Sequence, residues 1–206
     1  MNECKDHLDH EFVIQKVRCW LQKAVIGLNL CPFAKSVFVK QQIRYVVSEA
    51  RNVETLLIDL ITQLQYLLTV DASLIDTTIL IHPFVLENFL DYNDFLALAD
   101  QVLMRQGWDG ALQIASFHPA YQFADSAVDA IENYTNRSPF PILHLLREAS
   151  IDQAVDAFPD AAEIYQKNIQ TMRRLGLAGW EALFKADQAD CAAYPQRKPC
   201  ISPIIR

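Results

Sequence analysis

The sequence predicts an α/β fold, and its pattern of short apolar runs is the main reason. Runs rich in β-branched and aromatic residues at 43–48, 77–81 and 111–117 alternate with stretches that are apolar at helical spacing. These three runs end near residues 47, 82 and 118, so a strand-helix unit recurs at nearly equal length. Helical connections of this length usually join parallel strands with a right-handed crossover. We therefore expect a central β-α-β-α-β unit with parallel strands, an N-terminal helix and a helical C-terminal third; an α+β arrangement is the alternative.

The helices of the first half follow from their apolar stripes and their end signals. Residues 12–29 form an amphipathic stripe, and Pro32 prevents its simple continuation. Residues 53–69 form a second stripe, for which Asn52 is a suitable N-cap. A third helix is expected at 93–106, starting near Asp91 or Asn93 and ending at Gly107.

The last third should be a polar loop followed by short helices. After residue 124 the chain is polar, and Pro141 suits the first position of a helix over 141–149. Further helices are expected at 151–157, 160–175 and 178–187, separated by Pro159 and Gly176. Residues 194–206 contain three prolines and should form an extended tail on a single domain that spans residues 1–206.

Composition narrows the classes of function. The chain has 206 residues, 51% hydrophobic and 21% charged, which is typical of a folded globular protein. Its net charge of −7 argues against a nucleic-acid partner. The N-terminus has no signal-peptide pattern, and no apolar run approaches the roughly 20 residues of a membrane helix. We therefore expect a cytoplasmic protein without a membrane partner, whose five irregularly spaced cysteines are reduced.

Two of the three predicted strands end in the same pair, His82-Pro83 and His118-Pro119. Proline cannot donate to a strand ladder and pushes the preceding residue toward extended geometry, so His-Pro ends a strand well. If the strands are parallel, both imidazoles leave the sheet at one edge, beside Ser48 at the end of the first strand. Ligands of open α/β sheets bind outside the carboxyl ends of the strands, so this edge is the first candidate site.

The densest polar stretch is ENYTNRSPFP, residues 132–141, which can either line a site or connect elements as a solvated loop. Arg137 lies in it, and Arg147 lies beside His144 on the exposed face of the helix predicted to follow. Guanidinium groups bind carboxylates and phosphates in a bidentate manner, so the two arginines could form an anion clamp. Ion pairs that only stabilise the fold are the alternative. Asn133 and Tyr121 are further candidates for substrate binding.

The sequence also leaves open whether the protein binds a metal and whether it has a reactive thiol. His82, His118 and His144 could hold a divalent metal, but their spacing matches no diagnostic metal motif, and hydrogen-bonded structural histidines are the alternative. Cys31 could have a lowered pKa if it begins a turn at Pro32, or a raised pKa if it ends the first helix, and a buried structural cysteine is the alternative to a reactive one. A glycine-rich nucleotide loop is not expected, because the chain has only five glycines.

Four stretches carry a resemblance to a known family: GLNLCPFAK (27–35), IHPF with DYNDFL (81–96), QIASFHPAYQFA (113–124) and ENYTNRSPFPILHLLREAS (132–150). With them the chain resembles the bacterial family called domain of unknown function 1415, over roughly residues 12 to 180. The resemblance implies no activity, because the family has no established one. It does imply that the family's signature blocks hold the residues chosen above on chemistry, namely Cys31, His82, His118, Arg137, His144 and Arg147.

The function predicted from these residues is a small cytoplasmic enzyme that acts on an anionic small molecule. His118 and His144 would be the general acid and base, and Cys31 a nucleophile or ligand. Arg137, Arg147, Asn133 and Tyr121 would bind the substrate. Metal-assisted hydrolysis is one reaction that a bound divalent metal would allow. The alternatives are a non-catalytic protein that binds a metabolite or a partner, and a protein that handles a metal or haem.

Overall fold

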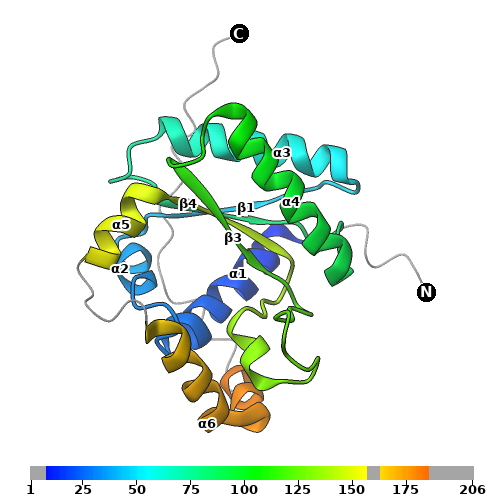
Figure 1. Ribbon diagram of the computed structural model, residues 1–206, viewed down its shortest axis with the longest axis vertical. Coiled ribbons are helices and arrows are strands. Elements are labelled where there is room, and N and C mark those ends of the chain that lie inside the picture. Colours follow the sequence, from blue (N-terminus) through cyan, green and yellow to red (C-terminus); the bar gives the residue numbers. More distant parts are fainter. Residues whose placement is uncertain (1–7, 157–162, 186–206) are drawn as a thin grey trace.

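The computed structural model describes residues 8–156 and 163–185 and shows a four-stranded sheet with helices on both faces (Figure 1). The strand order is β1-β2-β4-β3, with β1 and β2 parallel and β4 antiparallel to both of its neighbours. The strands are β1 (Ile43–Val47), β2 (Thr77–Ile81), β3 (Leu112–Phe117) and β4 (Ile142–Arg147). Because β2 and β3 both oppose β4, they run in the same direction. The predicted α/β class and its three repeated strands are confirmed.

Strand β4 replaces the helix that the sequence predicted over 141–149, and that prediction is wrong. Leu143 and Leu145 face one side of the sheet, and Ile142 packs on the other. A central strand is covered on both faces, so it becomes a nearly continuous apolar run such as ILHLL. Such a run fits helical and strand periodicity equally well, and its position between β2 and β3 decides the outcome.

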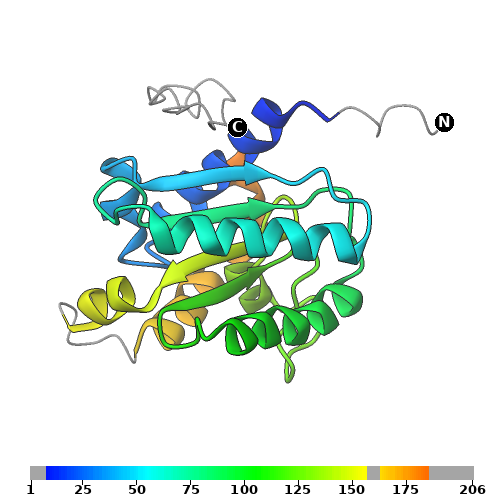
Figure 2. The same cartoon turned by 90° about the horizontal axis from the view of Figure 1, so that it is seen from above.

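Helices α3 (Val53–Thr69) and α4 (Phe89–Gln106) cover one face of the sheet (Figure 2). Helix α3 has the predicted bounds, and the Asn52 side chain accepts a hydrogen bond from the Thr55 amide at 2.9 Å. Helix α4 begins four residues earlier than predicted, because the Asn88 side chain is its N-cap. It ends as predicted at Gly107, which has a φ of 67° that favours glycine.

The opposite face is covered by the N-terminal helix and by the last helix. Helix α1 (His10–Trp20) continues into a π-helical turn, η1 (Leu21–Ile26), and the two pack with α6 (Ile164–Lys185) on a second apolar cluster. This helical stretch ends near Gly27, where a β-carbon would lie only 2.4 Å from the Lys23 carbonyl oxygen. The short helix α2 (Ala34–Val39) follows and leads into β1.

The remaining elements connect β3, β4 and α6. A 3-10 turn, η2 (Ile131–Thr135), lies in the polar loop, and α5 (Glu148–Asp156) follows β4 directly. Helix α6 changes direction at Gly176, at a φ of 65° and ψ of 174°, as the predicted break between two helices required. The predicted tail at 194–206 lies outside the described residues. Within those residues, no helix has the length and apolarity needed to cross a membrane.

Candidate functional site

The two His-Pro pairs lie at the same edge of the sheet, as predicted from the strand spacing. Both rings lie on the α4 side and pack around Tyr92, with ring centroids 5.7 Å away for His82 and 5.0 Å away for His118. Phe89 and Tyr121 pack against the same group, which we call the histidine cluster. Neither histidine has any exposed surface, so the cluster is closed.

The histidines of this cluster form hydrogen bonds with nearby backbone groups. His118 accepts a hydrogen bond from the Ala120 amide at 3.0 Å and donates from Nε2 to the Leu86 carbonyl at 3.2 Å, so both of its nitrogens are engaged. His82 donates from Nδ1 to the Val85 carbonyl at 3.0 Å, while its Nε2 has no partner. Burial lowers the pKa of His82 to about 4 and also lowers that of His118, so both rings are neutral near pH 7.

His144 lies on the other face of the sheet. Its Nε2 is 2.7 Å from the Thr77 hydroxyl, and its ring is near Phe117. Burial lowers the pKa of His144 to about 4. The sheet therefore separates His144 from His82 and His118. Across the described ranges, no group of three histidine, cysteine or acidic side chains is placed to hold a metal.

The structure does not bring Arg137 and Arg147 together, so the predicted clamp geometry is wrong. Arg147 lies at the far end of β4 from the polar loop, and the two ends of that six-residue strand are roughly 17 Å apart at about 3.4 Å per residue. Its guanidinium donates to the carbonyls of Val70 at 2.7 Å and Ile75 at 3.3 Å. These bonds hold the segment between α3 and β2 against the sheet.

The polar loop is organised by two of the predicted binding residues. Asn133 is fully buried, donates to the Ala127 carbonyl and accepts from the Phe123 amide and the Ser126 hydroxyl. Arg137 donates to the carbonyls of Tyr121 and Val128, and its guanidinium lies 4.3 Å from the centre of the Tyr134 ring. The loop is therefore ordered by its own side-chain hydrogen bonds and is not a solvated connector.

The thiols differ from the prediction in one respect. Cys31 is a free thiol, and its burial raises its pKa against the opposing effect of the Phe33 and Ala34 amides. A raised pKa keeps the thiol protonated near pH 7, which disfavours a nucleophilic role. Cys19 was expected to be reduced and is disulfide-bonded here. Cys4, Cys191 and Cys200 lie outside the described residues.

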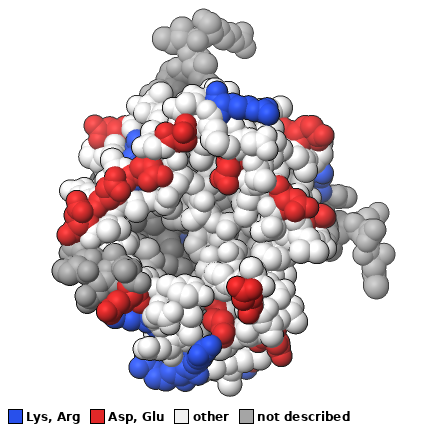
Figure 3. Space-filling model, in the orientation of Figure 1, with Lys and Arg blue, Asp and Glu red and all other residues white. Residues whose placement is uncertain are grey.

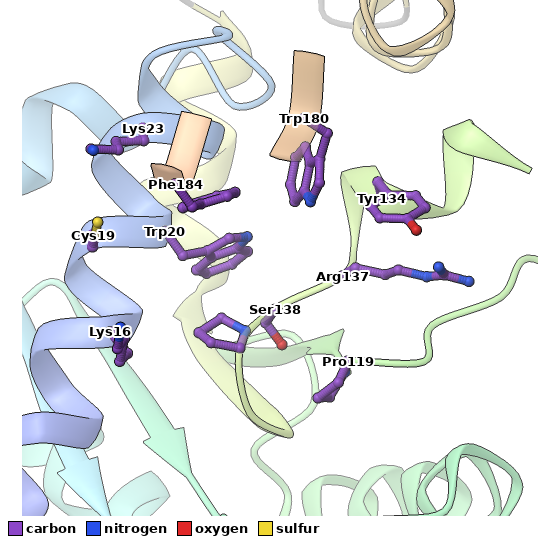
Figure 4. A pocket seen from close by; sticks show the side chains of 11 residues that line it. Lys16, Cys19, Trp20, Lys23, Pro119, Tyr134, Arg137, Ser138, Trp180 and Phe184 are labelled. Atoms are coloured by element: carbon purple, nitrogen blue, oxygen red, sulfur yellow. The ribbon is translucent and has the colours of Figure 1, made fainter. Parts of the chain in front are cut away.

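A pocket of about 360 Å³ lies between α1, the polar loop and the second half of α6 (Figure 4). We call it the aromatic pocket, because rings from three elements line it. Its lining comprises Lys16, Cys19, Trp20, Lys23, Pro119, Tyr134, Arg137, Ser138, Pro139, Trp180 and Phe184. Tyr134 and Trp180 meet edge to face with centroids 5.4 Å apart, and Phe184 packs on Trp180 at 5.5 Å.

Contacts between α6 and the rest of the chain fix the shape of this pocket. Asn168 donates to the Leu30 carbonyl at 2.8 Å, and Arg173 pairs with Glu132 of η2 at 3.1 Å. Both contacts lie in the half of α6 before Gly176, and Trp180 and Phe184 follow that break. Trp180 and Phe184 are thus joined, through the non-helical Gly176, to the half of α6 that these two contacts hold in place.

Charge in the aromatic pocket is the opposite of the charge of the whole chain. Lys16, Lys23 and Arg137 line it, and among its described lining residues none is acidic, although the chain carries a net charge of −7. Figure 3 shows acidic side chains over most of this face of the molecule and a group of basic ones at its lower end, near α6. Local positive charge attracts anions even on an acidic protein.

Sequence reasoning selected Arg137 and its loop but missed the residues on α1 and α6. Lys16, Trp20 and Lys23 recur at spacings of four and three, so one helical face presents a ring between two cations. That pattern is visible in the sequence, but it does not distinguish this helix from an ordinary amphipathic helix. Trp180 and Phe184 are also four residues apart, and nothing in the sequence indicates that they face the first helix.

The described lining of the pocket offers groups that suit the binding of a ligand. Its described lining contains no imidazole and no carboxylate to act as a general base. The Ser138 hydroxyl donates to the Phe140 carbonyl at 2.5 Å, so its proton already has an acceptor. Rings, ammonium groups and a guanidinium can instead hold an anion with an apolar part.

Comparisons with known proteins identify the family and nothing beyond it. A search among curated proteins and a search among solved structures each found no match. One family model matches residues 12–182, which include the sheet, both His-Pro pairs, the polar loop and most of α6. The chain therefore belongs to the family described as "Protein of unknown function (DUF1415)".

Proposed function

We propose that this protein binds an anionic small molecule in the aromatic pocket. The observation that carries the proposal is a concave, ring-lined site with three cationic side chains and, among its described lining residues, no acidic one, in a chain of net charge −7. A pocket of about 360 Å³ suits a small metabolite, since ligand sites usually measure about 300–1,000 Å³. The cytoplasmic location expected from the sequence belongs to this proposal.

Binding is favoured over catalysis at this pocket. The residues assigned to acid-base chemistry, His118 and His144, are absent from its described lining, and the Ser138 hydroxyl already has an acceptor. Arg137 remains a binding candidate through its position in the wall, although two of its donors serve loop carbonyls. A guanidinium has five donors, so others remain for an anion.

Isothermal titration calorimetry with a panel of small carboxylates and phosphates tests the proposal. The double variant Lys16→Ala with Lys23→Ala removes two positive charges from the pocket. The matched control, Lys35→Ala with Lys40→Ala, removes two from exposed positions on α2 and at its end. We expect at least one panel member to bind the wild type, with affinity falling about tenfold in the pocket variant and little in the control. The absence of any binding at millimolar concentration, or an equal loss in both variants, would refute the proposal.

A further inference from the structure

The aromatic pocket contains an unpaired hydrogen-bond donor. The indole nitrogen of Trp20 has no partner among the described residues, and the residue as a whole is 5% exposed. A buried tryptophan N–H normally finds an acceptor, so an unpaired one calls for an explanation. Figure 4 shows this nitrogen directed toward the space that Trp180 and Tyr134 border. An acceptor on a bound molecule would supply the missing partner.

The surroundings of Trp20 define what that molecule must carry. Lys16 lies one helical turn before Trp20 and lines the same pocket, so its ammonium group adds positive potential to the pocket that an acceptor would enter. Trp180 is 8% exposed and Phe184 39% exposed, so the second half of α6 offers one covered ring and one open ring. Flat rings pack well against such walls, in offset or edge-to-face geometry.

We infer that the ligand is an aromatic carboxylate, with its carboxylate on the Trp20 indole N–H and its ring between Trp20, Tyr134 and Trp180. This inference rests on the proposed function and narrows it to one class of anion. A carboxylate accepts hydrogen bonds through two oxygens, so it can receive the indole donor and face a lysine at the same time. An aliphatic anion would satisfy the charges and leave the rings without a partner.

Three probes of similar size distinguish the contribution of the charge from that of the flat ring. They are 2-naphthoate, decahydro-2-naphthoate with the charge but no flat ring, and 2-naphthalenemethanol with the flat ring but no charge. Calorimetry on the wild type should give 2-naphthoate an affinity at least fivefold above either of the others. If decahydro-2-naphthoate binds as tightly as 2-naphthoate, the aromatic inference is wrong and the proposed anion site stands. If neither carboxylate binds, the proposed function loses its support as well.

Trp20→Phe tests the donor, because phenylalanine keeps an apolar ring and removes the N–H. The matched control is Trp108→Phe, since Trp108 packs with α3 and α4 on the other side of the sheet. We expect Trp20→Phe to weaken 2-naphthoate binding about tenfold, the effect of one hydrogen bond to a charged group, and Trp108→Phe to leave it unchanged. Equal affinity in wild type and Trp20→Phe would contradict the role of the indole.

A spectroscopic test covers the case in which Trp20→Phe does not fold. The chain has three tryptophans, so a ¹⁵N-labelled sample gives three indole N–H signals. Trp108→Phe and Trp180→Phe assign the Trp20 signal by elimination. Addition of 2-naphthoate to the wild type should move the Trp20 indole proton downfield and slow its exchange with water. A Trp20 signal that does not respond at saturating 2-naphthoate overturns the inference.

Discussion

The histidine cluster and the aromatic pocket are both built from rings, and each contains a buried nitrogen without a partner. In the histidine cluster it is Nε2 of His82, whose ring lies against Tyr92 and has no exposed surface. In the pocket it is Nε1 of Trp20, a residue that lines a space of about 360 Å³. The difference teaches that an unpaired polar atom suggests a ligand where a cavity adjoins it, and strain or a structural role where neighbouring rings close over it.

The two regions also differ in how their polar groups are used. In the histidine cluster, the imidazoles bond backbone atoms of the segments that follow β2 and β3, and the Tyr92 phenol bonds backbone atoms at the ends of β3 and β4. Tyr92 donates to the Ile142 carbonyl at 2.7 Å and accepts from the Phe117 amide at 3.1 Å. In the aromatic pocket, by contrast, cationic and aromatic side chains line a cavity. Three predictions test this contrast, in order of decreasing effect.

The largest expected effect is a loss of stability in acid that originates in the histidine cluster. Burial, with a smaller contribution from His118, holds the pKa of His82 at about 4 in the folded chain, against about 6.5 when unfolded. The unfolded chain therefore binds the extra proton first as the pH falls below 6.5. The stability that His82 contributes is complete above pH 6.5 and is lost between 6.5 and 4, by about 2.5 kcal/mol at pH 4.5.

Urea unfolding at pH 7.5 and pH 4.5 measures this loss in wild type, His82→Gln and His144→Gln. His82→Gln should show a smaller loss between the two pH values, by about 2.5 kcal/mol. Burial lowers the pKa of His144 to about 4 as well, so His144→Gln should show a reduction of similar size on the other face of the sheet. An unchanged pH dependence in His82→Gln would show that the histidine cluster is open to solvent.

The second prediction concerns Tyr92→Phe. Loss of the hydroxyl leaves the Ile142 carbonyl and the Phe117 amide without this partner, inside a buried region. We expect the free energy of unfolding to fall by about 2 kcal/mol, the cost of leaving buried groups unpaired. Affinity for 2-naphthoate should not change, because the pocket lies on the other side of the sheet. A binding defect matching the stability defect would show that the two regions are coupled.

Most of the fold followed from the sequence because its signals are local. The 53–69 helix has an apolar stripe and an N-cap at Asn52, and both act within a few residues. Strand β4 did not follow, because ILHLL fits two periodicities and only its place between β2 and β3 distinguishes them. Its misassignment also turned His144 and Arg147 into neighbours on one helical face, whereas in a strand they face opposite sides.

The candidate site was harder to predict, because its residues come from segments far apart in the chain. Arg137 lies in a conspicuous polar loop and was selected, but Trp20 and Trp180 are apolar residues on ordinary helices. Their meeting depends on how α6 packs against α1 and η2, which no local pattern specifies. The His-Pro pairs gave a strong sequence signal for strand ends, and the edge they mark is closed by Phe89 and Tyr121.

The smallest expected effect separates the sequence interpretation of Arg147 from the structural one. As half of an anion clamp, Arg147→Lys would abolish ligand binding and preserve the fold. In the structure one guanidinium nitrogen donates to the carbonyls of both Val70 and Ile75, and the guanidinium does not line the pocket. A lysine can reach one such carbonyl but lacks the planar fork, so we expect a loss of about 1 kcal/mol in unfolding free energy. Binding of 2-naphthoate should be unchanged. Arg137→Lys is the matched comparison, because the same substitution there alters a residue of the pocket wall and should weaken binding. If Arg147→Lys weakens binding as much as Arg137→Lys does, the ligand lies nearer the far end of β4 than the aromatic pocket allows.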